Sequence, residues 1–70
     1  MITMGSMFEL SKKILTKVSF DKALFRKELG KAFSYLKREE KVLLKVWALA
    51  TFGHTYKDVI IEVYRTVMRS

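Results

Sequence analysis

The chain has 70 residues, with 14 Lys and Arg against seven Asp and Glu, one histidine and no cysteine. This length allows one domain at most, and the lack of cysteine excludes disulfides and thiolate metal sites. Half of the residues are hydrophobic, yet a chain of this size buries only about 60% of its unfolded surface. We therefore expect self-association, as a homodimer or a higher oligomer, to complete the core.

The net charge of +7 gives the protein a positive field, which attracts nucleic acid, anionic membranes and acidic proteins. A lysine-rich surface that keeps an apolar protein soluble explains the same charge without any binding role. No uninterrupted apolar run of about 18 residues is present, so no transmembrane segment is expected. The absence of cysteine fits a reducing compartment, and we expect a cytoplasmic protein.

Residues 1–6 are expected to be an expression tag or a disordered leader, which leaves 7–70 as a single helical domain. A Gly-Ser pair precedes a second methionine, Met7, as at a cloning junction. The competing interpretation is that Ser6 caps the first helix, because Glu9 stands where a capping box needs an acid.

The first predicted helix covers about residues 7–18. Its apolar side chains recur at helical spacing, with Phe8 and Leu15 on the flank of the main stripe. That stripe consists of Met7, Leu10, Ile14 and Val18. A helix this short is marginal alone, so the stripe is expected to pack against the rest of the chain.

The second predicted helix covers about residues 20–36 and starts at Ser19 or Asp21, either of which can accept a free backbone N–H. If Asp21 is the N-cap, Phe20 and Phe25 occupy the two positions of a hydrophobic staple. The core positions expected on this helix are Phe25, Leu29, Ala32, Phe33 and Leu36.

A turn is predicted at residues 37–39, although no Gly or Pro forces one. Glu39 and Glu40 suit a new helix N-terminus, and a helix running through this segment would be long for a small domain. The third helix then covers about residues 39–52, with Trp47 expected at the centre of the core. Its apolar stripe consists of Val42, Leu43, Val46, Trp47 and Ala50.

Two glycines carry conformational predictions. Gly30 lies inside the second helix, where it costs about 1 kcal/mol relative to alanine; a close helix approach and a tolerated defect both explain it. Gly53 is expected to end the third helix in the left-handed conformation. Thr55 and Asp58 then offer a capping box for the next helix, so residues 53–55 predict a tight helix–turn–helix connection.

The last predicted helix covers about residues 56–68. Its β-branched content favours a strand on local propensity, but the helical period accounts for every apolar position except Ile61. The helical stripe consists of Tyr56, Val59, Ile60, Val63, Tyr64, Val67 and Met68. The chain is therefore predicted to be all-α, a small bundle of three to four short amphipathic helices.

No catalytic, cofactor-binding or metal site is predicted. Glu39 and Glu40 are adjacent on a helix, so their side chains diverge. Asp58 and Glu62 share a face, but a solvated first turn explains them better than a cation site does. His54 is best explained as a polar contact at a helix end.

The leading functional hypothesis is a non-enzymatic protein–protein interaction module that self-associates. The apolar residues expected on its surface are Phe8, Ile61 and Met68. The alternative is a nucleic-acid-binding protein in which the second and third helices form a hairpin with a basic outer ridge. The residues of that ridge are Lys27, Lys31, Arg38, Lys41 and Lys45. A third interpretation is a cationic peptide that lies on anionic membranes.

Overall fold

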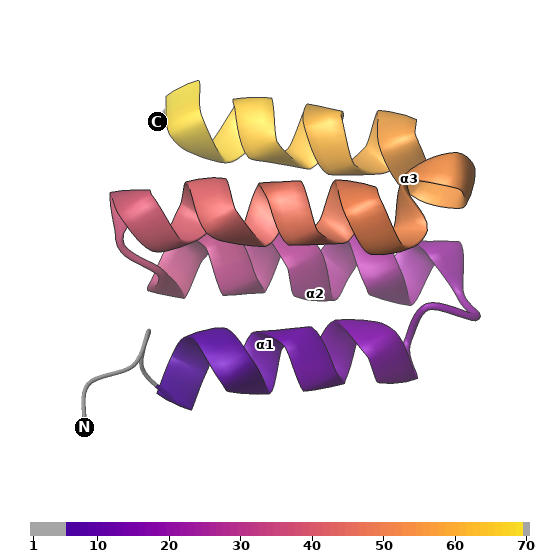
Figure 1. The fold of residues 1–70 in the computed structure, drawn as a ribbon. Coiled ribbons are helices and arrows are strands. Elements are labelled where there is room, and N and C mark those ends of the chain that lie inside the picture. The colour runs from indigo at the N-terminus through magenta and orange to yellow at the C-terminus, as the bar shows by residue number, and fades with distance from the viewer. Residues whose placement is uncertain (1–5, 70) are drawn as a thin grey trace.

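The computed structural model describes residues 6–69 and folds them into three α-helices, with no strand among the described residues. The helices are α1 (Ser6–Lys17), α2 (Lys22–Tyr35) and α3 (Arg38–Arg69) (Figure 1). The predicted all-α class is therefore confirmed. The leader predicted over residues 1–6 lies outside the described residues, apart from Ser6 at the start of α1.

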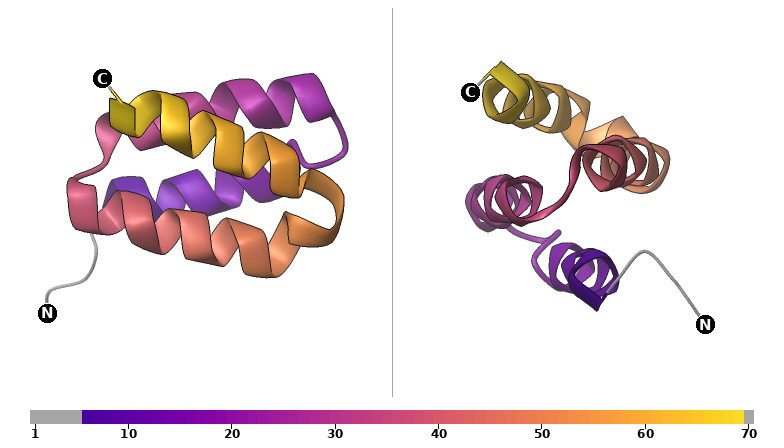
Figure 2. Two further views of the ribbon diagram at one scale, coloured as in Figure 1. Left: turned by 90° about the horizontal axis from the view of Figure 1, so that it is seen from above. Right: turned by 90° about the vertical axis from the view of Figure 1, so that its left-hand side faces the viewer.

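The long helix α3 is interrupted at Tyr56, whose backbone is non-helical, at φ −120° and ψ 23°. The chain reverses direction at this bend, so two arms of α3 lie antiparallel and side by side (Figures 1 and 2). Residues 38–55 are termed the N-terminal arm and residues 56–69 the C-terminal arm. The predicted third and fourth helices thus correspond to the two arms of one kinked helix.

The end view in Figure 2 shows how the bundle is arranged. α2 and the N-terminal arm lie in the middle, while α1 and the C-terminal arm lie at opposite corners. The largest fully buried side chains come from all of these elements and are Leu15, Phe25, Leu29, Phe33, Leu44 and Ile60. Every core position predicted on the second helix is buried, because these residues face α1 and the two arms of α3.

The connection between α1 and α2 is set by Asp21, which is the N-cap of α2. Its carboxylate accepts a hydrogen bond from the backbone N–H of Leu24 at 3.1 Å, which satisfies one free donor of the first turn. The predicted staple, however, is wrong: Phe20 is 80% exposed while Phe25 is fully buried. Phe25 is covered by aromatic rings of α3 instead, so it needs no contact from Phe20.

The turn predicted at residues 37–39 is confirmed, although it lies slightly earlier, at residues 36–37. α2 ends at Tyr35, Leu36 is extended, and α3 begins at Arg38. The Glu40 carboxylate accepts a hydrogen bond from the Lys37 backbone N–H at 3.3 Å, and the N–H of Lys41 donates to the Lys37 carbonyl at 2.8 Å. An acid in the first turn thus stabilises this helix start.

Tyr56 ties the bend in α3 to the connection between α1 and α2. Its ring stacks on Phe25 with centroids 4.6 Å apart, and its hydroxyl donates to the Ser19 carbonyl at 2.7 Å. The C-terminal arm that follows is helical, as the periodicity predicted, and buries Val59, Ile60 and Val63.

The buried face of α1 differs from the predicted stripe. Phe8, Ser11 and Leu15 are buried, whereas Met7 and Leu10 are more than 40% exposed, at 42% and 47%. Burial of a serine here costs little, because its hydroxyl donates to the Met7 carbonyl at 2.7 Å. The residues predicted at the flank of the stripe, Phe8 and Leu15, therefore belong to the buried face of α1.

The N-terminal arm is rotated by about half a turn from the prediction. It buries Leu44 and Ala48, which lie roughly opposite the predicted stripe on a helix of 3.6 residues per turn. Of that stripe, Val42, Leu43, Val46 and Ala50 are exposed. Trp47 is half-buried at the edge of the core, and its expected central place is taken by phenylalanines of α2.

Neither glycine prediction that invoked special geometry holds. The helix continues through Gly53, whose φ is not left-handed, and the change of direction falls on Tyr56. A Cβ added at Gly53 would lie 3.9 Å from Leu49, and one at Gly30 would lie 3.8 Å from Val63. Both are ordinary van der Waals distances, so neither position needs glycine for space.

Candidate interaction surfaces

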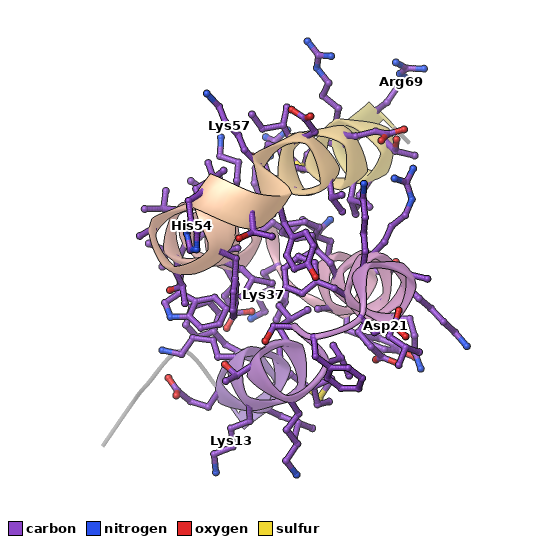
Figure 3. All side chains as sticks on the ribbon, turned by 90° about the vertical axis from the view of Figure 1, so that its right-hand side faces the viewer. Lys13, Asp21, Lys37, His54, Lys57 and Arg69 are labelled. Atoms are coloured by element: carbon purple, nitrogen blue, oxygen red, sulfur yellow. The ribbon has the colours of Figure 1, made fainter. Side chains whose placement is uncertain are left out.

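The N-terminal arm presents an apolar strip to solvent. Val42, Leu43 and Val46 are 39%, 45% and 55% exposed, and Ala50 is exposed one turn further on. Glu39 extends the strip at one end, and His54 extends it at the other, next to the bend (Figure 3). These six residues share one side of the helix by their spacing and are termed the outer face.

The outer face carries no Lys or Arg, although the chain has 14 of them. Lys45 of this arm points toward the bundle: it is half-buried, with its ammonium 4.5 Å from the centre of the Tyr64 ring on the C-terminal arm. A cation over an aromatic face is an attractive contact. The arm therefore turns a cation toward its neighbour and leucine and valine toward solvent.

A second apolar surface lies between α1 and α2 and is termed the α1–α2 groove. It encloses about 220 Å³. Its apolar lining comes from both helices and consists of Met7, Leu10, Ile14, Ala32 and Tyr35. Its polar lining consists of Ser11, Glu28 and Lys31.

The five basic residues proposed to contact nucleic acid do not form the expected outer ridge. Lys41 and Lys45 are half-buried, because the N-terminal arm is rotated and their row turns toward the bundle. Lys27 and Lys31 line an open groove of about 500 Å³ between α2 and the C-terminal arm, and Lys31 also lies 3.9 Å from Glu28. Arg38 is exposed at the start of α3.

Of the three residues expected on an apolar surface, Phe8 is wrong. Its side chain is buried in the core, because α1 turns the Phe8–Leu15 side inward. Ile61 and Met68 are both half-buried on the C-terminal arm. The larger exposed apolar residues lie on α1, on the α1–α2 connection, on α2 and on the N-terminal arm.

An ion pair links α2 to the C-terminal arm at the surface. Arg26 donates a hydrogen bond to Glu62 at 3.0 Å, and a second nitrogen–oxygen pair lies at 2.9 Å. The hydrogen bond from Arg26, its charge and that of Lys22 lower the pKa of Glu62, against a smaller opposing effect of desolvation. The hydrogen bond and the charge of Glu62 in turn raise the pKa of Arg26.

The acidic residues are scattered. Glu40 is engaged by the Lys37 backbone and Glu62 by Arg26, while Asp58 is exposed. Across residues 6–69, no three His, Cys, Asp or Glu side chains converge as a metal site requires. No buried side-chain nitrogen or oxygen in this part of the chain lacks a hydrogen-bond partner.

Sequence reasoning missed the outer face for an identifiable reason. From Val42 to Ala50 only Lys45 is polar, so apolar residues lie on every side of the helix and periodicity cannot choose between them. The sequence signal that could have revealed this face is the number of apolar residues in the segment. An arm with more apolar residues than one neighbour can cover must expose some of them.

None of the helices within residues 6–69 has both the length and the apolar character needed to cross a membrane. Comparisons with protein-family models, curated proteins and solved structures found no match to this chain.

Proposed function

We propose that this chain is a non-enzymatic protein–protein interaction module that self-associates through the outer face of the N-terminal arm. The observation that supports this most is the exposure of Val42, Leu43 and Val46 side by side, at 39%, 45% and 55%. A strip of large apolar side chains in water costs free energy that a covering surface recovers.

Charge favours a second copy as that covering surface. Two molecules of net charge +7 repel each other overall, so they must associate where cations are absent. The outer face meets this condition. In an antiparallel pair related by a two-fold axis near Val46, Glu39 of each copy comes next to His54 of the other, which places a carboxylate next to an imidazole that can donate a hydrogen bond.

The size of the strip sets the strength of the contact. From Glu39 to His54 the helix rises about 22 Å, and a strip one helix wide offers less than the roughly 800 Å² per partner of a standard interface. We therefore expect a weak dimer that forms in the range of tens to hundreds of micromolar.

A protein partner is favoured over nucleic acid by the placement of the basic residues. Lys41 and Lys45 are both half-buried, and Lys45 contacts Tyr64, so two of the five candidate phosphate contacts are turned toward the bundle. Phosphate binding requires cations that are free to replace counterions along a backbone.

The test is sedimentation velocity from tens to hundreds of micromolar, with Val46→Glu as the variant. The wild type should shift toward a dimer with concentration, and Val46→Glu should remain monomeric, because the two-fold axis brings two buried carboxylates together. Val46 is more than half exposed, so its replacement should leave the helical circular dichroism unchanged.

Two results would overturn this proposal. One is a wild type that stays monomeric throughout the concentration range. The other is binding to a DNA duplex or RNA that falls steeply with salt and is lost on Lys27→Glu, which would favour the nucleic-acid alternative.

A further inference from the structure

We propose that the α1–α2 groove binds an acidic amphipathic helix of another protein. This contact is independent of the outer face, which belongs to a different helix. The argument has three parts: the shape of the groove, the charge of its rim, and the poor fit of a second copy.

The groove has the dimensions of a helix-binding site. Met7, Leu10 and Ile14 line one wall at helical spacing, and Ala32 and Tyr35 line the other. The seven-residue step from Met7 to Ile14 rises about 10 Å, which matches the length of a two-turn apolar anchor set at i, i+3 and i+7 on a docked helix.

The apolar lining and Ser11 can be covered without leaving an unsatisfied hydrogen-bond donor. Met7 and Leu10 are 42% and 47% exposed, and Tyr35 is 65% exposed, so a partner would remove apolar surface from water. Ser11 is the buried polar residue of the lining, and its hydroxyl is already bonded to the Met7 carbonyl. An apolar anchor placed over it therefore leaves no donor without a partner.

The rim of the groove is basic on balance, with Lys31 and the exposed Lys17 against Glu28. Lys31 lines it directly, and Lys17 follows Leu10 and Ile14 at i+7 and i+3 on the same stripe of α1. Lys13 lies further out on α1, where it points away from the bundle (Figure 3). Glu28 is the acid in the lining, and Lys31 lies 3.9 Å from it.

This charge selects the partner. Glu and Asp on the flanks of a docked helix would face Lys17 and Lys31, whereas Lys or Arg there would be repelled. Complementary rim charges mainly raise the association rate and suppress the wrong partners, and the apolar anchors supply most of the affinity.

A second copy fits the groove poorly. It would bring a further +7 charge toward a basic rim. A contact between the groove of one copy and the outer face of another would also be head-to-tail, and such a contact gives a ring or an open filament rather than a closed dimer. An acidic helix from a different protein meets neither obstacle.

The probe is a pair of synthetic helical peptides of about five turns, each with leucines at i, i+3 and i+7. One carries Glu at the flanking positions and the other carries Lys there. Binding of each labelled peptide to the full chain is followed by fluorescence anisotropy at low and at physiological salt. We expect micromolar binding of the acidic peptide and at least about tenfold weaker binding of the basic one.

Two matched variants locate the site. Leu10→Glu places a carboxylate in the groove and should weaken the acidic peptide at least about tenfold. Val46→Glu places the same group on the outer face and should leave peptide binding unchanged while removing self-association. Both positions are about half exposed, and circular dichroism checks that each variant keeps its helices.

Three outcomes would overturn this inference. Equal binding of the two peptides removes the charge argument, and loss of binding on Val46→Glu but not on Leu10→Glu moves the site to the outer face. Binding to phosphatidylglycerol vesicles that is lost on Leu10→Glu, with no peptide binding, would identify the groove as a lipid contact. If self-association fails while the peptide results hold, the groove inference stands without the dimer.

Discussion

The two arms of α3 are similar in length but use their apolar residues differently. The C-terminal arm turns its apolar stripe inward and its charges outward, with Lys57, Asp58 and Arg65 exposed. The N-terminal arm buries Leu44 and Ala48 but leaves a second set of apolar residues in water. A helix with one apolar stripe has one way to pack, whereas a helix that is apolar on most sides takes the orientation that its neighbours allow.

The largest expected effect comes from two adjacent leucines of the N-terminal arm. Leu44 is fully buried and Leu43 is 45% exposed. Leu44→Ala should lower the free energy of unfolding by about 2–5 kcal/mol, because it leaves a cavity in the core. Leu43→Ala should change it by only about 0.5 kcal/mol, as at other surface positions.

Urea unfolding of both variants below the dimerisation range measures this difference. The pair is its own control, because the two substitutions remove the same atoms from neighbouring positions of one helix. If Leu43→Ala proved to be the more destabilising change, the arm would pack through the stripe that periodicity predicted, and the outer face would not exist.

These leucines also show what could be predicted from the sequence. The core of α2 and the helical state of the C-terminal arm follow from a clean 3.6-residue period, with polar residues such as Lys27 and Glu62 on the other side. The Asp21 cap and the turn near Lys37 follow from local hydrogen-bonding chemistry. Such features depend on short stretches of chain and need no knowledge of the neighbouring helices.

What could not be predicted depends on contacts between elements. The burial of Phe8 and the exposure of Val46 are decided by how α1 and the N-terminal arm are rotated against α2. The bend falls on Tyr56 rather than Gly53, where its ring can stack on Phe25 and its hydroxyl can reach Ser19. The candidate surfaces are what remains uncovered after this packing, so they could not be read from periodicity.

The next largest effect on stability is expected at the bend between the two arms of α3. Tyr56→Phe keeps the stacking on Phe25 but removes the 2.7 Å hydrogen bond to the Ser19 carbonyl. We expect a loss of about 0.5–1.5 kcal/mol in the free energy of unfolding, the usual net value of such a bond. Tyr35→Phe is the control, because that ring is 65% exposed. Equal losses for both variants would contradict an anchoring role for the Tyr56 hydroxyl.

Gly53→Ala tests the backbone geometry next to the same bend. The sequence and the structure predict opposite signs for the change in stability. A left-handed glycine would make alanine destabilising by about 1 kcal/mol or more. In the structure Gly53 is not left-handed and an added Cβ meets Leu49 at 3.9 Å, so alanine should stabilise by about 0.4–1 kcal/mol. Gly30→Ala, with an ordinary contact of 3.8 Å to Val63, should be stabilising for the same reason. Thermal unfolding of each variant gives the sign.

The smallest expected effect concerns the Arg26–Glu62 pair, which joins the C-terminal arm to α2. The pKa of Glu62 is lowered in the folded state by the hydrogen bond from Arg26 and by its charge. Because a lowered carboxyl pKa means that the unfolded state binds protons more readily, the pair adds stability above the ordinary Glu pKa of about 4.3. That contribution is lost as the pH falls through the lower pKa of the folded state.

Arg26→Met should therefore be slightly less stable than the wild type at pH 7, and the two should converge under acidic conditions. The difference at neutral pH should shrink in high salt, because the two side chains are 47% and 59% exposed and solvent screens them. Lys27→Met removes a neighbouring charge outside the pair and should show no such convergence. Urea unfolding at neutral and acidic pH, each at two salt concentrations, measures these differences. A gap between Arg26→Met and the wild type that persisted in acid would mean that Arg26 acts by packing its alkyl chain, and that the C-terminal arm is held to α2 by apolar contacts alone.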